Sequence, residues 1–216
     1  MSLLKSFFVI CIFTVLANCA SLPEGYERHA SHAFEDTSDT HLGRNVAPAV
    51  KAHGGETGIY LLNKAMDAFV ARIKIIEKAE RSLDVQYYIW HEDITGKAMH
   101  NRLIHAAERG VRVRLLLDDL DTAGKEDTLV ALDSHPNIEI RLFNPFANRN
   151  NRMLDFASDL GRVNRRMHNK SLTADNQISV AGGRNIGDEY FGAEELGVEF
   201  SDLDVVAIGP VVKDIS

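Results

Sequence analysis

The chain has 216 residues, of which 45% are hydrophobic and 25% charged, a composition that predicts a folded core and excludes a disordered or collagen-like polymer. Its 24 Lys and Arg residues against 31 Asp and Glu residues give a net charge of −7, which disfavours nucleic-acid binding through a broad basic face. Both cysteines, Cys11 and Cys19, lie near the start, which excludes a disulfide framework, a cysteine nucleophile and a thiolate metal site from the rest of the chain.

Residues 1–19 have the pattern of a signal peptide. Lys5 supplies a positive start, and the apolar run Phe7–Ala17 is too short to cross a hydrocarbon core of ~30 Å as a helix. The run leads into Leu-Ala-Asn-Cys, which resembles a bacterial lipobox with asparagine where a smaller residue is usual. We therefore expect a lipoprotein of the bacterial cell envelope, held at the inner or the outer membrane by acyl chains on Cys19. An ordinary secretory signal is the alternative.

Residues 20–57 are predicted to form a flexible linker, because Ser, Thr, Asp, His, Gly and Pro prevail there and no apolar period is sustained. A regular alternation begins at residue 58, so we place a single folded lobe at 58–216. The histidines of the linker have spacings that match no compact set of metal ligands, and we interpret them as solvated loop residues. They are His29, His32, His41 and His53.

The expected elements of the lobe alternate between the helical and the strand period. The stretch 63–81 has an apolar stripe at helical spacing, whereas 83–90 is rich in aromatic and branched residues and is typical of a strand. The stripe consists of Met66, Phe69, Val70, Ile73 and Ile76. Further helices are expected at 95–109 and 125–134, and further strands at 111–117, 138–143, 171–173, 177–181 and 205–208. This order predicts an α/β fold with a mixed, mostly parallel β-sheet flanked by helices.

Several conspicuous side chains have an ordinary structural interpretation. We expect Asp118 and Asp119 to cap the next segment rather than to bind a metal, and His91–Asp93 to be a solvated turn, with substrate contact as the alternative. The helix histidines His100 and His105 are predicted to lie on the surface. Sheet packing is the expected role of Tyr87, Tyr88 and Trp90. The arginine-rich stretch 144–167 is either a solvated charged segment or a basic patch beside the next motif.

The segment 167–191 carries the strongest chemical signal. It contains His168-x-Lys170, then four residues and Asp175, and six residues later Gly-Gly-x-Asn ending at Asn185. A histidine and a lysine two positions apart on a strand point to the same side. The ammonium can bind a phosphate oxygen while the imidazole attacks phosphorus or moves a proton. The glycine pair lets the backbone approach an anion, and these groups supply a positive field without a metal ion.

The full pattern HxK(x)4D(x)6GGxN resembles the HKD motif of the phospholipase D superfamily. The segments YYIW, GVRVRLLLDD, HPNIEIRLFNPF, GRVNRRMHNK and GGRNIGDEYFGA resemble one branch of it, the cardiolipin synthase C type of envelope phosphatidyltransferase. The resemblance implies an α-β-α sandwich and a two-step transfer at phosphorus. One motif histidine forms a phosphohistidine, and a second protonates the leaving alcohol and then deprotonates the acceptor.

On this chain the resemblance makes His168 the nucleophile and makes Lys170 and Asn185 the clamp on the phosphate. Gly183 and Arg166 complete the expected phosphate-binding set. No cofactor or metal is implied.

Two aspartates also receive roles from the resemblance. Asp175 belongs to the motif and is grouped with the catalytic residues, with bracing of the strand turn as its alternative role. The carboxylate that orients the imidazole is assigned to Asp202, which lies two residues before Asp204.

The chain carries one HKD motif, whereas this family places two motifs face to face. Three hypotheses follow: a fragment whose second lobe stands elsewhere in cis, a homodimer that pairs two copies of His168, or an inactive relic. The expected substrates are anionic, phosphatidylglycerol-like phospholipids at a membrane, and no nucleic acid. A dimeric single-motif phosphodiesterase, either a phospholipase D or a nuclease, is the alternative enzyme.

Overall fold

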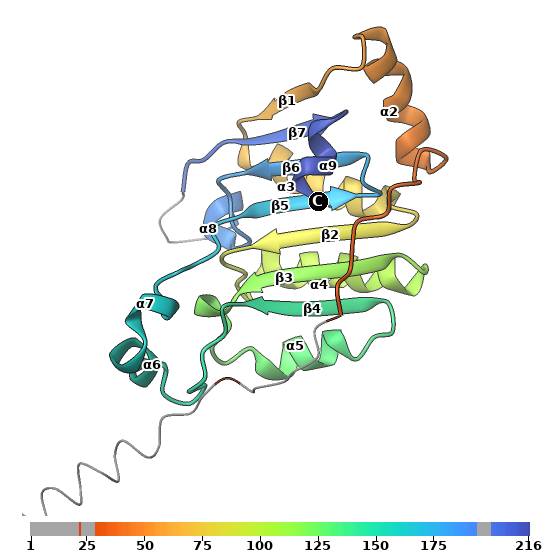
Figure 1. Cartoon of the computed structure of the whole chain (residues 1–216). Helices are drawn as coiled ribbons and strands as arrows, with labels where there is room; N and C mark the ends of the chain where they lie inside the picture. Colours follow the sequence, from red (N-terminus) through yellow and green to blue (C-terminus); the bar gives the residue numbers. More distant parts are fainter. Residues whose placement is uncertain (1–21, 23–28, 194–199) are drawn as a thin grey trace, which may run out of the picture.

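The computed structural model describes residues 22, 29–193 and 200–216, and these form one seven-stranded sheet with helices packed against it (Figure 1). The strands are β1 (Gly58–Leu62), β2 (Ser82–Tyr87), β3 (Arg112–Asp118), β4 (Ile138–Phe143), β5 (Lys170–Ala174), β6 (Ile178–Gly182) and β7 (Asp204–Ile208). The helices are α2 (His41–Ala52), α3 (Ala65–Lys78), α4 (Ile94–Glu108), α5 (Glu126–Asp133), α6 (Arg152–Ser158), α7 (Leu160–Val163), α8 (Asp188–Phe191) and α9 (Val211–Ile215), with one 3-10 turn, η1 (Asp119–Asp121).

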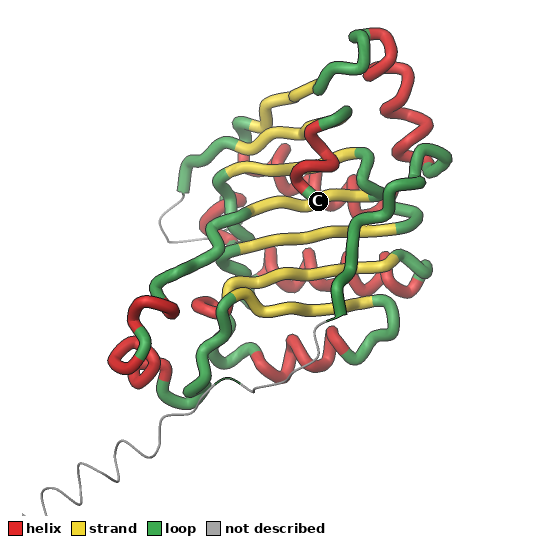
Figure 2. Tube along the Cα trace, in the orientation of Figure 1, coloured by secondary structure: helices red, strands yellow, loops and turns green. Residues whose placement is uncertain are grey.

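The strand order is β1-β7-β6-β5-β2-β3-β4. The neighbours β2, β3 and β4 pair in parallel, whereas all other neighbouring strands pair antiparallel. Helices α3 and α4 lie against one face, and the segment 29–40 together with α9 crosses the other (Figures 1 and 2). The mixed sheet flanked by helices is confirmed, but the expectation that it is mostly parallel is wrong. Only two of the six neighbouring pairs among its described strands are parallel, both in the β-α-β-α-β run that contains α4 and α5.

The core lies between the sheet and α3 and α4. Strand β2 is buried along nearly its whole length, although its residues alternate between polar and apolar. Its buried Asp84 is paired with Arg114 of β3. Helix α3 corrects the expected stripe, because Met66 and Val70 are 57% and 45% exposed whereas Arg72 is fully buried. The guanidinium of Arg72 has buried partners in Tyr87 and Asp204, and this pairing turns α3 away from its most apolar face.

The region expected to be a flexible linker differs from the prediction. Residues 41–52 form α2, which begins at Thr40, whose hydroxyl accepts a hydrogen bond from the Gly43 N–H at 3.1 Å. The segment before it is tied to the sheet by side chains of the strands, including Arg112 to the His32 carbonyl at 2.9 Å. The segment needs few apolar side chains because its backbone carbonyls, rather than its side chains, make these contacts with the sheet. The expected signal peptide and Cys19 lie outside the described residues.

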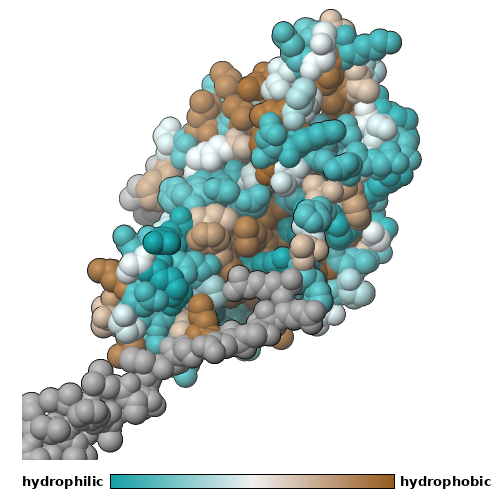
Figure 3. All heavy atoms as spheres, in the orientation of Figure 1, coloured by the Kyte–Doolittle hydropathy of each residue, from teal (hydrophilic) through white to brown (hydrophobic). Residues whose placement is uncertain are grey.

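Strand β1 forms an edge of the sheet and was not predicted. Its residues Ile59, Tyr60 and Leu61 are 60–70% exposed and only Leu62 at its end is buried, so no alternation of buried positions marks the strand in the sequence. Figure 3 shows hydrophobic surface gathered at this end of the molecule. No helix within the described ranges is long and apolar enough to cross a membrane.

Candidate active site

The residues His168 and Lys170 of the HKD motif lie on the side of the sheet where the ends of several strands meet. Strand β5 begins at Lys170, which pairs with Tyr87 at the end of the antiparallel β2. Strand β6 ends at Gly182, which pairs with Asp204 at the start of β7. This antiparallel register brings the segment before β5, the loop after β6 and the loop after β2 to the same edge, although they are far apart in the sequence.

The imidazole of His168 is exposed at this edge. Its Nδ1 lies 3.1 Å from Nζ of Lys170, and its ring packs against Tyr88 with centroids 4.5 Å apart. Because an ammonium only donates, Nδ1 is the acceptor in this contact, and the proton of a neutral imidazole is on Nε2. Attack through Nε2 therefore requires Lys170 to turn away from the ring, as it would toward a bound phosphate, and the proton to move to Nδ1.

Lys170 is buried, with 6% of the residue exposed. Its Nζ also donates to the carbonyl of His168 at 3.0 Å and lies 5.4 Å from the centre of the Tyr88 ring. Burial lowers the pKa of Lys170, and the carboxylate of Asp202 opposes this shift. The expectation that the His168 and Lys170 side chains point to the same side is met by this contact.

Asn185 is 4% exposed, and both ends of its amide have protein partners. Its Oδ1 accepts from the Ile89 N–H at 3.0 Å, and its Nδ2 donates to the hydroxyl of Tyr190 at 2.9 Å. The amide group has a second N–H, which is the one that a phosphate oxygen would use. The structure gives Asn185 first a positioning role, because it joins the loop after β6 to the loop that carries Tyr88.

Asp202 lies over Gly183 rather than against the imidazole of His168. Its Oδ1 accepts from the Leu203 N–H at 2.8 Å, and a Cβ on Gly183 would come within 1.9 Å of the same oxygen. Gly183 thus makes room for the Asp202 carboxylate, a role that differs from the expected approach to an anion. Among the described residues, no carboxylate forms a hydrogen bond with His168, so the orienting role of Asp202 stays a prediction.

Asp175 is not part of this site, which corrects its grouping with the catalytic residues. It follows β5 at the end opposite Lys170 and is fully buried. Its carboxylate accepts backbone N–H groups from Glu80, Arg81 and Ser82, at 2.7–3.2 Å. The structure therefore supports the alternative role, bracing of the chain. The carboxylate accepts hydrogen bonds from three backbone N–H groups at the connection between α3 and β2 that would otherwise lack a partner.

Arg166 is also corrected, since its guanidinium is already bound. It donates to Asp118 at 3.0 Å and to the Asn144 carbonyl at 2.8 Å. Asp118 further accepts from the N–H groups of Met167 at 2.7 Å and Leu120 at 2.8 Å, so it caps η1 as expected and fixes the backbone next to His168. This is a structural ion pair rather than a free phosphate ligand.

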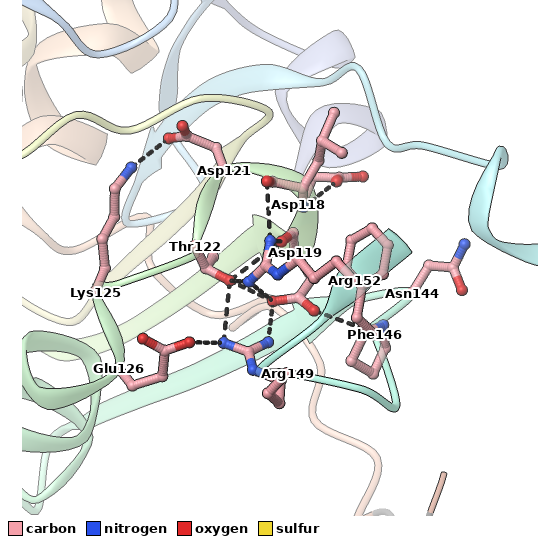
Figure 4. Close-up of polar contacts among 12 residues, drawn as sticks. Asp118, Asp119, Asp121, Thr122, Lys125, Glu126, Asn144, Phe146, Arg149 and Arg152 are labelled. Atoms are coloured by element: carbon pink, nitrogen blue, oxygen red, sulfur yellow. Dashed lines mark hydrogen bonds and ion pairs between the residues drawn. The ribbon is translucent and has the colours of Figure 1, made fainter. Parts of the chain in front are cut away.

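Three other arginines of the basic stretch are paired in the same way. Figure 4 shows Asp119 between Arg149 and Arg152, and the buried carboxylate also accepts from the Phe146 N–H at 2.7 Å. Arg162 pairs with Asp155 and Asp159. These paired cations hold α6 and α7 to the end of β3, so most of the stretch is neither a solvated segment nor an open basic patch. Arg165 is exposed.

Among the described residues, one group of side chains could hold a metal ion, and it lies at the turn after β2. Atoms of His91, Asp93 and Glu189 lie within 4.8 Å of one another, and His91 Nδ1 is 3.2 Å from Glu189. Asp93 is already committed as the N-cap of α4 and as acceptor of the Asp188 N–H at 2.7 Å. These contacts explain the cluster without an ion, and the turn is partly buried rather than fully solvated.

Two contacts at the site could not be expected from the sequence, and one histidine was misplaced. Tyr88 was interpreted as sheet packing, yet its ring contacts His168. Tyr190 holds Asn185, with no motif to mark it. His100 was predicted to lie on the surface, but only 8% of it is exposed because its ring stacks on Trp90, with 4.7 Å between centroids. His105 is exposed as expected.

Comparisons with known proteins identify the family. Residues 73–207 match the family model described as "Cardiolipin synthase, PLD-like domain", so the chain belongs to the cardiolipin synthase-like part of the phospholipase D superfamily. It is 55% identical over 175 residues to cardiolipin synthase C of Escherichia coli, which covers 81% of this chain and 37% of that protein. Cardiolipin synthase B of the same species is 32% identical over 162 residues, covering 73% and 36%.

Solved structures share the fold at low sequence identity. NucT from Helicobacter pylori superposes with a TM-score of 0.51 and 18% identity, covering 71% of this chain and 85% of that one. Phosphatidylserine synthase from Haemophilus influenzae superposes with a TM-score of 0.53 and 16% identity, covering 72% and 34%. The chain spans less than half the length of the curated relatives it matches.

Proposed function

We propose that the chain supplies the nucleophilic half-site of a cardiolipin synthase-like phosphatidyltransferase. The observation that supports this is an exposed imidazole next to a buried ammonium, His168 and Lys170, in a chain 55% identical to cardiolipin synthase C over 175 residues. An ammonium held at this position neutralises charge that develops on phosphate oxygens. The substrates proposed are anionic phospholipids.

The reaction has two balanced steps. Nε2 of His168 attacks phosphorus, the bond from phosphorus to the leaving alcohol breaks, and the alcohol departs with a proton from an acid. An acceptor hydroxyl then gives its proton to the same group and attacks, so the nitrogen–phosphorus bond breaks and His168 is regenerated. A glycerol hydroxyl of a second lipid yields cardiolipin, and water yields phosphatidic acid.

The acid must come from outside the described half-site, because one imidazole cannot attack phosphorus and protonate the opposite oxygen. The proposed partner is a second HKD motif, carried either by a longer chain in cis or by a second copy of this chain. A two-fold dimer would place a second His168 across the site. Membrane attachment through lipidated Cys19 is proposed from the lipobox pattern alone, and loss of palmitate labelling in Cys19→Ser tests it.

A substrate with a good leaving group tests the nucleophile without the missing acid. A p-nitrophenyl phosphodiester of glycerol releases p-nitrophenolate, which needs no proton at neutral pH. We expect a burst of at most one equivalent per chain and a covalent, acid-labile phosphate adduct. Both should be absent in His168→Asn and present in His105→Asn, a matched change of an exposed histidine on α4. An adduct that persists in His168→Asn overturns the assignment, and no adduct in the wild-type chain supports the relic hypothesis.

The nuclease alternative depended on a free basic patch. Arg149, Arg152, Arg162 and Arg166 are instead paired with aspartates. With a net charge of −7, this pairing disfavours a nucleic-acid substrate.

A further inference from the structure

A small cavity lies beside Tyr88, the residue whose ring contacts His168. It is lined by Tyr88, Trp90, Glu92, His100 and Lys125, among other residues near the ends of β2 and β3. Its free volume is about 10 Å³, which is the space of a single water molecule or hydroxyl group. Tyr88 therefore forms part of both the proposed nucleophile site and this cavity.

Two buried polar atoms of the lining have no hydrogen-bond partner among the described residues. They are Nε2 of His100 and Oε1 of Glu92. His100 is more than nine-tenths buried and is held flat against Trp90, with an angle of 7° between the rings. Burial is costly for a polar atom without a partner, and such atoms in folded proteins almost always have one. The cavity is thus shaped for a polar occupant.

Nε2 of His100 and Oε1 of Glu92 need different hydrogen-bond partners, one an acceptor and the other a donor. The pKa of His100 is lowered to about 4 by burial, which outweighs the attraction of Glu92, and Lys125 lowers it further. The imidazole is therefore neutral near pH 7, and its Nε2 can carry a proton to donate. The Glu92 carboxylate only accepts. A hydroxyl group satisfies both atoms at once, because it accepts from Nε2–H and donates to Oε1.

We propose that this cavity is a subsite for one hydroxyl group of a polyol, the glycerol head group that serves as acceptor or leaving alcohol. This inference rests on the proposed phosphatidyl transfer, since it names the alcohol that the His168 site would use. The lining disfavours other groups: its three carboxylates, from Glu92, Asp118 and Asp121, outnumber its one cation, Lys125, which disfavours a phosphate, and the volume excludes a ring or an acyl chain.

Trp90 makes the subsite directly observable, because it is the one tryptophan of the sequence and stacks on His100. The full chain is titrated with glycerol, with 1-propanol, which has the same three carbons but one hydroxyl, and with ethanolamine. We expect a saturable change of Trp90 fluorescence with glycerol, at least tenfold weaker with 1-propanol. The change should be lost in Glu92→Leu and in His100→Phe but kept in Glu108→Gln, an exposed position on α4.

The transfer reaction gives a second measurement. The adduct formed from the p-nitrophenyl substrate is incubated in buffered glycerol, where glycerol or water resolves it slowly without the missing acid–base group, and the ratio of the two products is independent of the total rate. We expect Glu92→Leu to lower the glycerol-to-water ratio at least tenfold relative to Glu108→Gln. If no adduct forms, the proposed function fails while the fluorescence still decides the subsite.

Three results overturn the inference. The first is a fluorescence response equal for glycerol and 1-propanol, which means that the cavity holds only a structural water. The second is saturation by ethanolamine but not by glycerol, which would make it an ammonium site. The third is an unchanged product ratio in both Glu92→Leu and His100→Phe when each variant is folded by circular dichroism.

Discussion

The two ends of β5 carry residues of the same motif and are built in opposite ways. At its start, His168 is exposed and its ring is held by Lys170 and Tyr88. At its far end, Asp175 is fully buried and accepts three backbone N–H groups. The histidine end can change partners when a substrate arrives, whereas the aspartate end cannot. One motif thus combines a chemical end with a structural end, separated by a buried strand.

The largest effect is expected at the exposed end. His168→Asn should reduce adduct formation by more than a thousandfold, because the neighbouring nitrogen, Nζ of Lys170, has no lone pair as an ammonium and binds phosphate oxygens instead. The free energy of unfolding should change by no more than about 0.5 kcal/mol, since the imidazole is exposed. Adduct yield by mass spectrometry and urea unfolding measure the two. A large loss of stability would contradict the assignment of a chemical role to the His168 end of β5 and a structural role to the Asp175 end.

The buried end should respond in the opposite sense. Asp175→Ala should lower the free energy of unfolding by about 3–5 kcal/mol, because three backbone donors lose a charged acceptor. The backbone of Asp175 has φ of 50°, which alanine tolerates less well than Asp or Asn, so Asp175→Asn should cost less. Urea unfolding gives the stabilities. Adduct yield per folded molecule should stay near the wild-type level, and a catalytic role would instead abolish it.

The sequence predicted the buried elements well and the exposed ones poorly. The strand expected at 111–117 matches β3 to within one residue, because burial of its alternate positions leaves a clear pattern. Strand β1 and helix α2 were missed, since they expose most of their side chains. At the site, the full motif and its family resemblance identified His168 and Lys170, which lie two residues apart. The contact of Tyr88 with His168 joins segments distant in sequence, and it depends on the antiparallel pairing of β2 and β5, which no local pattern encodes.

His100 gives a pH dependence of intermediate size. Its folded-state pKa of about 4 lies below the unfolded value of 6.5, so the unfolded chain binds the proton first as the pH falls. The stability from this group is complete above pH 6.5 and is lost between pH 6.5 and 4, on the order of 3 kcal/mol in total. Urea unfolding of His100→Phe should show that much less pH dependence than the wild type. The pH dependence of His105→Asn, a change on the exposed side of α4, should equal that of the wild type.

The smallest effect is expected between the two ends, at Gly183. An alanine Cβ there would meet the Asp202 carboxylate at 1.9 Å, so the carboxylate must move away. Because Asp202 is exposed, the displacement should cost only about 1 kcal/mol of stability. Its attraction now opposes the lowering of the Lys170 pKa by burial, and its removal should lower that pKa further. Titration of the 15N-labelled lysine by NMR measures the shift, and Asp202→Asn should reproduce it. An unchanged pKa in both variants would mean that Asp202 does not act on Lys170, and the exposed end would then consist of His168, Lys170 and Tyr88 alone.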